Sequence, residues 1–226
     1  MKVLKFILLL GLLVGCSKDV NITEDPIVEE VVDEKDSVET VDVRGFHNPI
    51  ASITFKDLGT ITFELYVQDA PQSVLNFVEL ANSKYYDGIS MHRIINNFVA
   101  QGGDPTGFGS GGPGYSIYGE FLSNNFENTV GHEYGALAFA RTQVPNSAGS
   151  QFYIVLSDYA DDQRQFMDEN YAAFGHILEG HDLLVIINEE YAAKDNSGIP
   201  LKELIIESIT IDTHEQQLPS PTKFSK

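Results

Sequence analysis

Residues 91–104, MHRIINNFVAQGGD, place a single arginine, Arg93, inside an apolar run that has the composition of a β-strand. A polar turn follows and leads to Phe98 and Gln101, after which the chain reaches two glycines. A cation, an aromatic ring and an amide in one mostly apolar segment indicate a small pocket with one strong hydrogen-bond donor. Taken alone, the pattern fits equally well an edge strand whose arginine extends its head group into water.

Strand-like patterns recur on both sides of this stretch, and two segments have helical patterns. Apolar residues alternate or run continuously over residues 50–55, 60–66, 115–118, 135–140, 151–156, 171–178 and 204–211. Helical spacing follows Asp69, a candidate cap, and Pro71, and it recurs over residues 181–190. Many short strands, two helices and long loops predict a closed antiparallel sheet with helices covering its ends.

The charge of the chain is strongly acidic. Its 226 residues include 14 Lys and Arg against 33 Asp and Glu, a formal net charge of −19. A nucleic-acid-binding protein needs a basic face to meet phosphates, so we expect no nucleic-acid partner. The length suffices for one domain of about 150 to 170 residues plus extensions.

The N-terminus has the features of a lipoprotein signal. Positive residues precede an apolar run over residues 6–14, which is too short to span a bilayer. The run ends in Leu-Val-Gly-Cys, which resembles a bacterial lipobox, and Cys16 is the single cysteine of the chain. We predict a signal peptide over residues 1–15, lipid on Cys16, and an envelope location on the extracytoplasmic side of a bacterial membrane. The alternative is an ordinary signal peptide with a chance cysteine.

A change in composition separates this leader from the folded part. Residues 17–44 contain ten acidic residues against three basic ones and no aromatic residue. Such a segment cannot bury enough apolar surface to offset its chain entropy. We predict an acidic flexible stalk over residues 16–47, a folded domain over residues 48–213 and a flexible tail over residues 214–226.

The folded part carries no recognisable metal or nucleophile motif. Its histidines lack the spacing of a ligand pair, and no serine lies in a G-x-S-x-G elbow. Residues 107–112 contain a G-x-G-x-x-G match, but Pro113 and a strand follow where a dinucleotide site requires a helix. The sequence therefore predicts no metal and no cofactor, and an apolar pocket with polar donors fits chemistry without a covalent step.

Four segments, in order, resemble the cyclophilin family of peptidyl-prolyl cis-trans isomerases. Residues 91–104 resemble the signature F-H-R-I-I-x-x-F-M-x-Q-G-G-D, and residues 116–121 resemble S-I-Y-G-E-x-F. Residues 135–154 resemble the bacterial form G-x-x-x-M-A-R…P-N-S-A-G-S-Q-F-F-I, and residues 174–175 resemble the start of F-G-x-V. The resemblance implies a mainly β fold, a closed eight-stranded antiparallel β-barrel capped by two α-helices. It also implies isomerase activity on proline-containing polypeptides.

The physics of this reaction suits the residues. An X–Pro bond rotates over a barrier of about 20 kcal/mol because of amide resonance, and the prolyl nitrogen regains its lone pair in the twisted state. A guanidinium beside that nitrogen would favour the twisted form over the planar one. Arg93 is the candidate donor, because it stays charged at any physiological pH. Gln101 would hold the substrate backbone so that rotation has a fixed end.

The resemblance also implies the walls of the pocket. Matching positions assign catalytic roles to Arg93, Phe98 and Gln101, and substrate-binding roles to Val99, Ala140, Arg141, Gln151, Tyr153, Phe166, Met167 and Tyr171. This chain departs from the best-known eukaryotic pattern, because Val99 replaces methionine, Met167 leucine and Tyr171 histidine. Tyr153 replaces a phenylalanine and adds a hydroxyl that must find a partner. Phe166 replaces tryptophan, and the lost N–H donor predicts weak cyclosporin binding.

Three hypotheses follow. The first is a membrane-tethered prolyl isomerase that assists the folding of exported proteins. The second is a module that binds proline segments with little turnover; the altered Val99 and Tyr153 favour it, whereas the intact Arg93 opposes it. The third is a surface lipoprotein that captures an unrelated ligand, and it rests on the predicted anchor and stalk alone.

Overall fold

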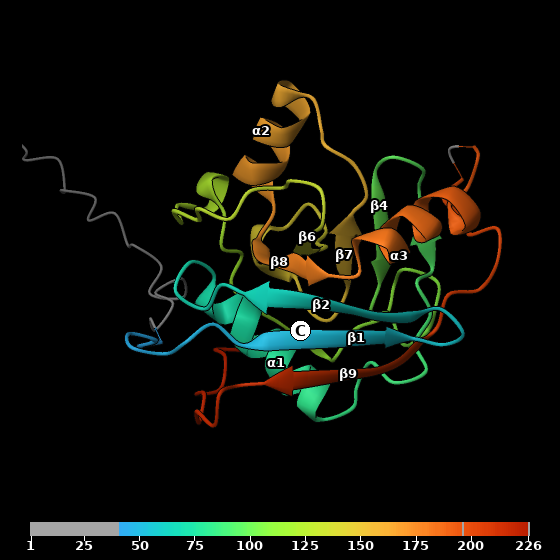
Figure 1. Cartoon of the computed structure of the whole chain (residues 1–226). Helices are drawn as coiled ribbons and strands as arrows, with labels where there is room; N and C mark the ends of the chain where they lie inside the picture. The colour runs from blue at the N-terminus through green and yellow to red at the C-terminus, as the bar shows by residue number, and fades with distance from the viewer. Residues whose placement is uncertain (1–40, 196, 226) are drawn as a thin grey trace, which may run out of the picture. The chain divides into compact units, whose positions relative to one another are not determined.

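The computed structural model describes residues 41–195 and 197–225, so the predicted signal peptide and Cys16 lie outside the described residues. Eight strands form one antiparallel sheet in the order β3-β4-β7-β6-β8-β2-β1-β9 (Figure 1). Their bounds are β1 (Ile50–Phe55), β2 (Gly59–Leu65), β3 (Arg93–Ile94), β4 (Val99–Gly102), β6 (Ala136–Phe139), β7 (Phe152–Val155), β8 (Ala173–Glu179) and β9 (Ile206–Asp212). The mainly β prediction and the number of strands are confirmed.

The prediction that the barrel is closed is wrong, because the sheet is a curled half-barrel with β3 and β9 at its two edges. Strand β3 is two residues long and pairs with β4 but not with β9. The segments that precede these two strands meet at a single isolated bridge, Ser90 to Ile205. Backbone hydrogen bonds join residues 88–91 to residues 204–206 beside this bridge, so the sheet approaches closure there, while β3 and β9 themselves stay unpaired with each other.

Three α-helices occur in the described part of the chain, where the sequence predicts two. They are α1 (Pro71–Asn82), α2 (Asp161–Asn170) and α3 (His181–Ile186), which a π-helical turn extends over Ile187–Tyr191. Helix α2 stands at the top of Figure 1, well separated from α1. Its sequence, DDQRQFMDEN, buries Met167 alone, so it lacks the apolar periodicity by which the other two helices are predicted.

Strands β1 and β2 show why the sequence predicts the sheet. Alternate residues of each strand are buried, as expected for strands with one face toward the core. The buried residues are Ala51, Ile53, Phe55, Ile61, Phe63 and Leu65. The residues between them on each strand face away from the core. A shift of one residue would expose the buried set, so the alternation also fixes the register of the pair.

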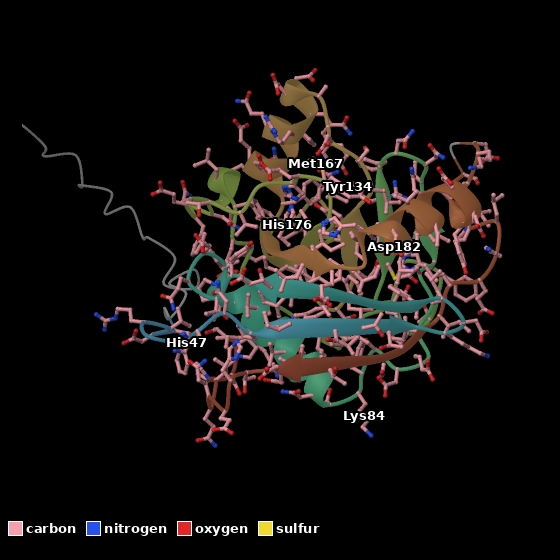
Figure 2. The ribbon with its side chains drawn as sticks, in the orientation of Figure 1. His47, Lys84, Tyr134, Met167, His176 and Asp182 are labelled. Atoms are coloured by element: carbon pink, nitrogen blue, oxygen red, sulfur yellow. The ribbon has the colours of Figure 1, made fainter. Side chains whose placement is uncertain are left out.

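Strand β7 is buried on both faces, and this places the site. Phe152 and Ile154 belong to the main core, whereas Tyr153 and Val155 belong to a second apolar cluster on the other face of the sheet. Met167 of α2 is part of that second cluster and lies on the portion of the helix nearest the sheet (Figure 2). Helix α2 thus covers an outer face that strand alternation alone would leave to water.

The start of α1 is stabilised from a distant loop. Asp69 is the cap that the sequence predicts, but Ala70 occupies the cap position and no side chain caps it locally. Asp69 instead bonds to a threonine hydroxyl. The fully buried Glu120 accepts the backbone N–H groups of Gln72 and Ser73 at 2.7 and 2.9 Å. These are donors that a helix leaves without intrahelical partners.

The folded region extends past the predicted limits at both ends. Val43 is buried in the main core, although the sequence places it in the stalk. Strand β10 (Phe224–Ser225) pairs with β5 (Tyr115–Ser116), where the sequence predicts a loose tail. Over residues 41–195 and 197–225 there is no helix whose length and apolar character would allow it to cross a membrane.

Candidate active site

A row of facing residues crosses three strands of the sheet. Arg93 on β3 lies opposite Gln101 on β4, and Gln101 lies opposite Tyr153 on β7. Directly opposed residues in antiparallel strands project from the same face. The hairpin of β3 and β4 therefore places the arginine and the amide side by side, and Arg93 Nη1 donates to Gln101 Oε1 at 3.1 Å.

The row continues into the glycine-rich loop. Gln101 Nε2 donates to Gln151 Oε1 at 3.1 Å, and Gln151 Nε2 donates to the carbonyls of Gly109 and Gly111 at 3.0 Å each. Burial of Asp104 acts to raise its pKa, but backbone N–H groups of this loop and the Thr106 hydroxyl outweigh it and lower that pKa to about 2. The loop is thus ordered around the Asp104 carboxylate. Its carbonyls orient the amide of Gln151, and Gln151 in turn orients the amide of Gln101.

The guanidinium of Arg93 is fixed in place but retains free donors. It lies 5.8 Å from the centre of the Phe98 ring, a cation–π contact. Its stem packs against Gly198, where a Cβ atom would lie 3.0 Å from Arg93 Cγ. None of the ion pairs found over residues 41–195 and 197–225 involves Arg93. Within the described part of the chain its guanidinium donates one side-chain hydrogen bond, to Gln101, so its other N–H groups are available to a bound molecule.

A pocket of about 280 Å³ opens over this row. Ten of the eleven positions that the family resemblance assigns to the pocket line it: Arg93, Phe98, Val99, Gln101, Ala140, Arg141, Tyr153, Phe166, Met167 and Tyr171. Gln151, the eleventh, lines an adjoining hollow of about 450 Å³ that shares Gln101, Ala140 and Arg141 with the pocket. The structure thus brings the predicted residues together, and their catalytic roles remain predictions.

Arg141 is locked in place on the far wall. Its Nε donates to the carbonyl of Asn170 at 2.7 Å, and its Nη1 donates to the carbonyl of Thr142 at 2.8 Å. Its guanidinium lies over the rings of Phe121 and Tyr171, at 4.7 and 4.9 Å from their centres. This second cation therefore joins the end of α2 to the wall of the pocket.

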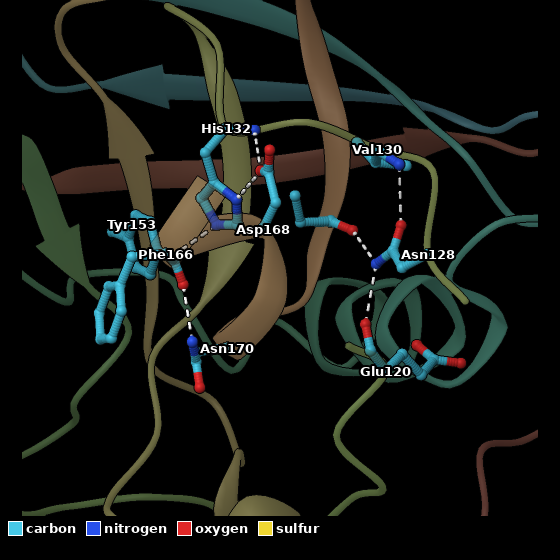
Figure 3. Close-up of polar contacts among 9 residues, drawn as sticks. Glu120, Asn128, Val130, His132, Tyr153, Phe166, Asp168 and Asn170 are labelled. Atoms are coloured by element: carbon cyan, nitrogen blue, oxygen red, sulfur yellow. Dashed lines mark hydrogen bonds and ion pairs between the residues drawn. The ribbon is translucent and has the colours of Figure 1, made fainter. Parts of the chain in front are cut away.

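The hydroxyl of Tyr153 has a hydrogen-bond partner. The sequence predicts that a partner must exist but does not identify it. It lies 2.9 Å from Nε2 of His132, which in turn contacts Asp168 (Figure 3). Burial raises the pKa of Tyr153 well above its ordinary value, so the hydroxyl stays protonated. The sequence does not single out His132 or Asp168, because each is a lone polar residue in a non-periodic segment. The tyrosine predicted on the pocket floor is the signal that a partner must exist.

The sequence also misses Tyr159. Its hydroxyl donates to the carbonyl of Phe98 at 3.0 Å, and the two rings lie 5.6 Å apart. This contact supports the Phe98 ring on the side away from the pocket. Burial raises the pKa of Tyr159, so its hydroxyl remains a donor. Nothing in the spacing of Tyr159 distinguishes it from an ordinary core residue.

These features define a class of protein. An apolar pocket, a fixed cation with free donors and two ordered amides form a site suited to a ligand that has hydrogen-bond acceptors. The polar groups that line the pocket are an arginine pair, a glutamine and two tyrosines, which suit electrostatic catalysis without covalent attack.

Comparisons with known proteins identify the family. The family model for cyclophilin type peptidyl-prolyl cis-trans isomerases matches residues 50–211. A Staphylococcus epidermidis protein described as a peptidyl-prolyl cis-trans isomerase is 35% identical over 73% of this chain and 93% of its own length. A Staphylococcus aureus protein of the same description is 38% identical over 68% of this chain and 87% of its own.

Solved structures agree. A crystal structure of a cyclophilin type isomerase from Cryptosporidium parvum matches with a TM-score of 0.64 and 30% identity, over 74% of this chain and 98% of that one. A second structure of that protein, in the presence of the dipeptide Ala-Pro, matches with a TM-score of 0.62. The chain belongs to the family of cyclophilin-type peptidyl-prolyl cis-trans isomerases. It is accordingly an isomerase of X–Pro bonds.

Proposed function

We propose that this isomerase accelerates X–Pro rotation in exported proteins and thereby assists their folding. The proline ring enters the apolar pocket, and a free N–H of Arg93 donates to the prolyl nitrogen as the amide twists. That bond is stronger in the twisted state than in the planar one, which is the requirement for catalysis. Gln101 holds the backbone beside the proline, so that rotation takes place about one fixed end.

The observation that carries this proposal is the Arg93–Gln101–Gln151 chain at the edge of an apolar pocket. It gives one cation a fixed direction in a partly dry site, where a charge-assisted hydrogen bond is stronger than in water. The test is a protease-coupled proline-peptide assay on the purified full chain. Cis-to-trans conversion should speed up in proportion to enzyme concentration.

A second candidate is a module that binds proline segments with little turnover. Val99 and Tyr153 alter two walls of the pocket, and either change could favour retention of a bound segment over its rotation. The same assay separates the two functions. Peptide binding by calorimetry without any acceleration of isomerisation would favour the binding module.

The location of the protein is also a proposal, and it rests on the lipobox. Cys16→Ser should abolish lipid attachment, because the thiol is the acceptor, and should move the protein from the membrane fraction to the soluble fraction. Fractionation of cells, with an immunoblot, measures this. A matched substitution in the predicted stalk, Ser17→Ala, should leave the distribution unchanged. Membrane retention of the Cys16 variant would contradict a lipid anchor.

Cyclosporin should bind weakly. The exposed Phe166 stands where tryptophan-bearing relatives have an indole N–H, so one donor is lost. A calorimetric titration should give a dissociation constant about fivefold weaker than that of a tryptophan-bearing relative, since one hydrogen bond contributes about 1 kcal/mol. Phe166→Trp should recover part of the difference. Equal affinity in the two proteins would contradict the prediction.

A further inference from the structure

Three polar side chains behind the pocket form one continuous hydrogen-bonded chain (Figure 3). Tyr153 Oη lies 2.9 Å from His132 Nε2, and His132 Nδ1 lies 2.8 Å from Asp168 Oδ1. The same carboxylate oxygen accepts the backbone N–H of His132 at 2.7 Å. The chain starts on β7, at the floor of the pocket, and ends on α2, which carries Phe166 and Met167.

The protons in this chain have a defined order. A carboxylate can only accept, so the bond to Asp168 places a proton on Nδ1 of His132. With that proton on Nδ1, Nε2 of the ring accepts the hydrogen bond that the Tyr153 hydroxyl donates. His132 has no exposed side-chain surface and Tyr153 is 4% exposed, so either group would be costly to leave without its partner. We therefore expect the three residues to act as a unit.

Helix α2 is attached to the rest of the domain at a few points, and this hydrogen-bonded chain is one of them. Met167 is its buried residue, and its mean composition is polar. Asp168 joins it to the loop that carries His132, and Asn170 joins its last turn to Arg141. Asp168 follows directly after Phe166 and Met167 on the helix, so its contact holds the part of α2 from which these two residues reach the pocket.

We propose that His132 and Asp168 are positioning residues, which hold the Tyr153 floor and the α2 wall of the prolyl pocket at a fixed separation. The inference rests on the proposed function of that pocket. Neither residue lines the pocket, so each acts through a neighbour. A pocket wall displaced by about 1 Å can cost a large factor in rate, because the substrate is no longer held in the reactive geometry.

Substitutions of Asp168 give the first test. Asp168→Ala removes both contacts to His132 and should lower kcat/KM in the proline-peptide assay by on the order of tenfold. Asp168→Asn keeps an acceptor oxygen at the same place, so it should restore the rate to within about twofold of wild type. Asp161→Ala is the matched control, since it removes the same charge from an exposed position on the same helix.

A spectroscopic readout separates a displaced wall from general loosening. With ¹³C-methyl methionine, Met167 reports on the α2 wall and Met91, buried in the main core, is an internal reference. Asp168→Ala should shift or broaden the Met167 methyl resonance and leave that of Met91 in place. Asp168→Asn should return the Met167 resonance toward its wild-type position.

A double-mutant cycle keeps the inference testable even where Asp168→Ala does not fold. Tyr153→Phe and His132→Asn each break the bond between these two residues, and His132→Asn can keep the bond to Asp168. If they act as a unit, the double variant should be no slower than the slower single variant. Additive losses, or wild-type kcat/KM with an unmoved Met167 resonance in Asp168→Ala, would overturn the inference. An inactive wild type would instead refute the proposed function, and the Met167 resonance would still decide the positioning role.

Discussion

Arg93→Ala should lower kcat/KM for a proline peptide by on the order of 10²-fold or more, a loss comparable to removal of one preorganised donor in other enzymes. The guanidinium is fixed by Gln101 and by the Phe98 ring before any substrate binds, so little reorganisation is needed when the amide twists. Alanine removes the donor and its charge together. The protease-coupled assay on the purified full chain measures the loss, with circular dichroism to verify folding.

Two further variants identify what the arginine supplies. Arg93→Lys keeps the charge but not the planar fork that reaches Gln101 and the substrate together, so it should retain only part of the activity. Arg164→Ala removes a cation from α2 that pairs with Asp161 at the surface, and it should leave the rate unchanged. A wild-type rate in Arg93→Ala would show that the pocket works by confinement alone and that no donor to the prolyl nitrogen is needed.

The sequence predicts the parts of the fold that obey a single period. Strands β1 and β2 alternate between core and water, and the predicted ranges agree with the observed ones within a residue or two. Helix α2 has no such period, because its outer surface is solvated and one residue, Met167, reaches the core. Closure of the sheet depends on whether β3 and β9, which lie at its two edges, meet in space, and this is a matter of tertiary geometry and not of composition.

The same distinction applies to the site. Arg93 and Gln101 are eight positions apart on one hairpin, and cross-strand pairing brings them together, so a local stretch of sequence contains both. The far wall required the family pattern, because Phe166 and Tyr171 come from a segment whose helix the sequence does not reveal. His132 and Asp168 lie 36 positions apart, and only the packing of α2 on the sheet brings them together.

Glu120→Gln should destabilise the protein at pH 5 by about 2 kcal/mol, because an amide NH2 cannot accept from the donors at the start of α1, whereas both oxygens of a carboxyl keep lone pairs even when one is protonated. Burial raises the pKa of Glu120 from an ordinary 4.5 to about 7, while hydrogen bonds from Ser73 and Gln72 act in the opposite direction. The folded state therefore binds a proton more tightly than the unfolded state does. Denaturant unfolding of both proteins between pH 5 and pH 8 measures the difference.

The sign of the pH dependence follows from that raised pKa. The contribution of Glu120 is complete below pH 4.5 and is lost as the pH rises through about 7, a change of about 3 kcal/mol. Glutamine does not titrate, so the stability advantage of the wild type over the variant should fall from pH 5 to pH 8 and reach zero or change sign near pH 8. Glu127→Gln, at an exposed position, should give a small difference that hardly changes with pH.

The opposite outcome would be equally informative. If the cost of Glu120→Gln grows as the pH rises, the fold prefers the carboxylate. The three donors at the start of α1, two backbone N–H groups and the Ser73 hydroxyl, would then outweigh the cost of burying the charge.

Helix α1 packs its Phe77 ring against Phe152 of β7, whose neighbour Tyr153 forms the pocket floor. The charge state of Glu120 therefore bears on the core that supports the site, and the direction of the trend decides which form stabilises it.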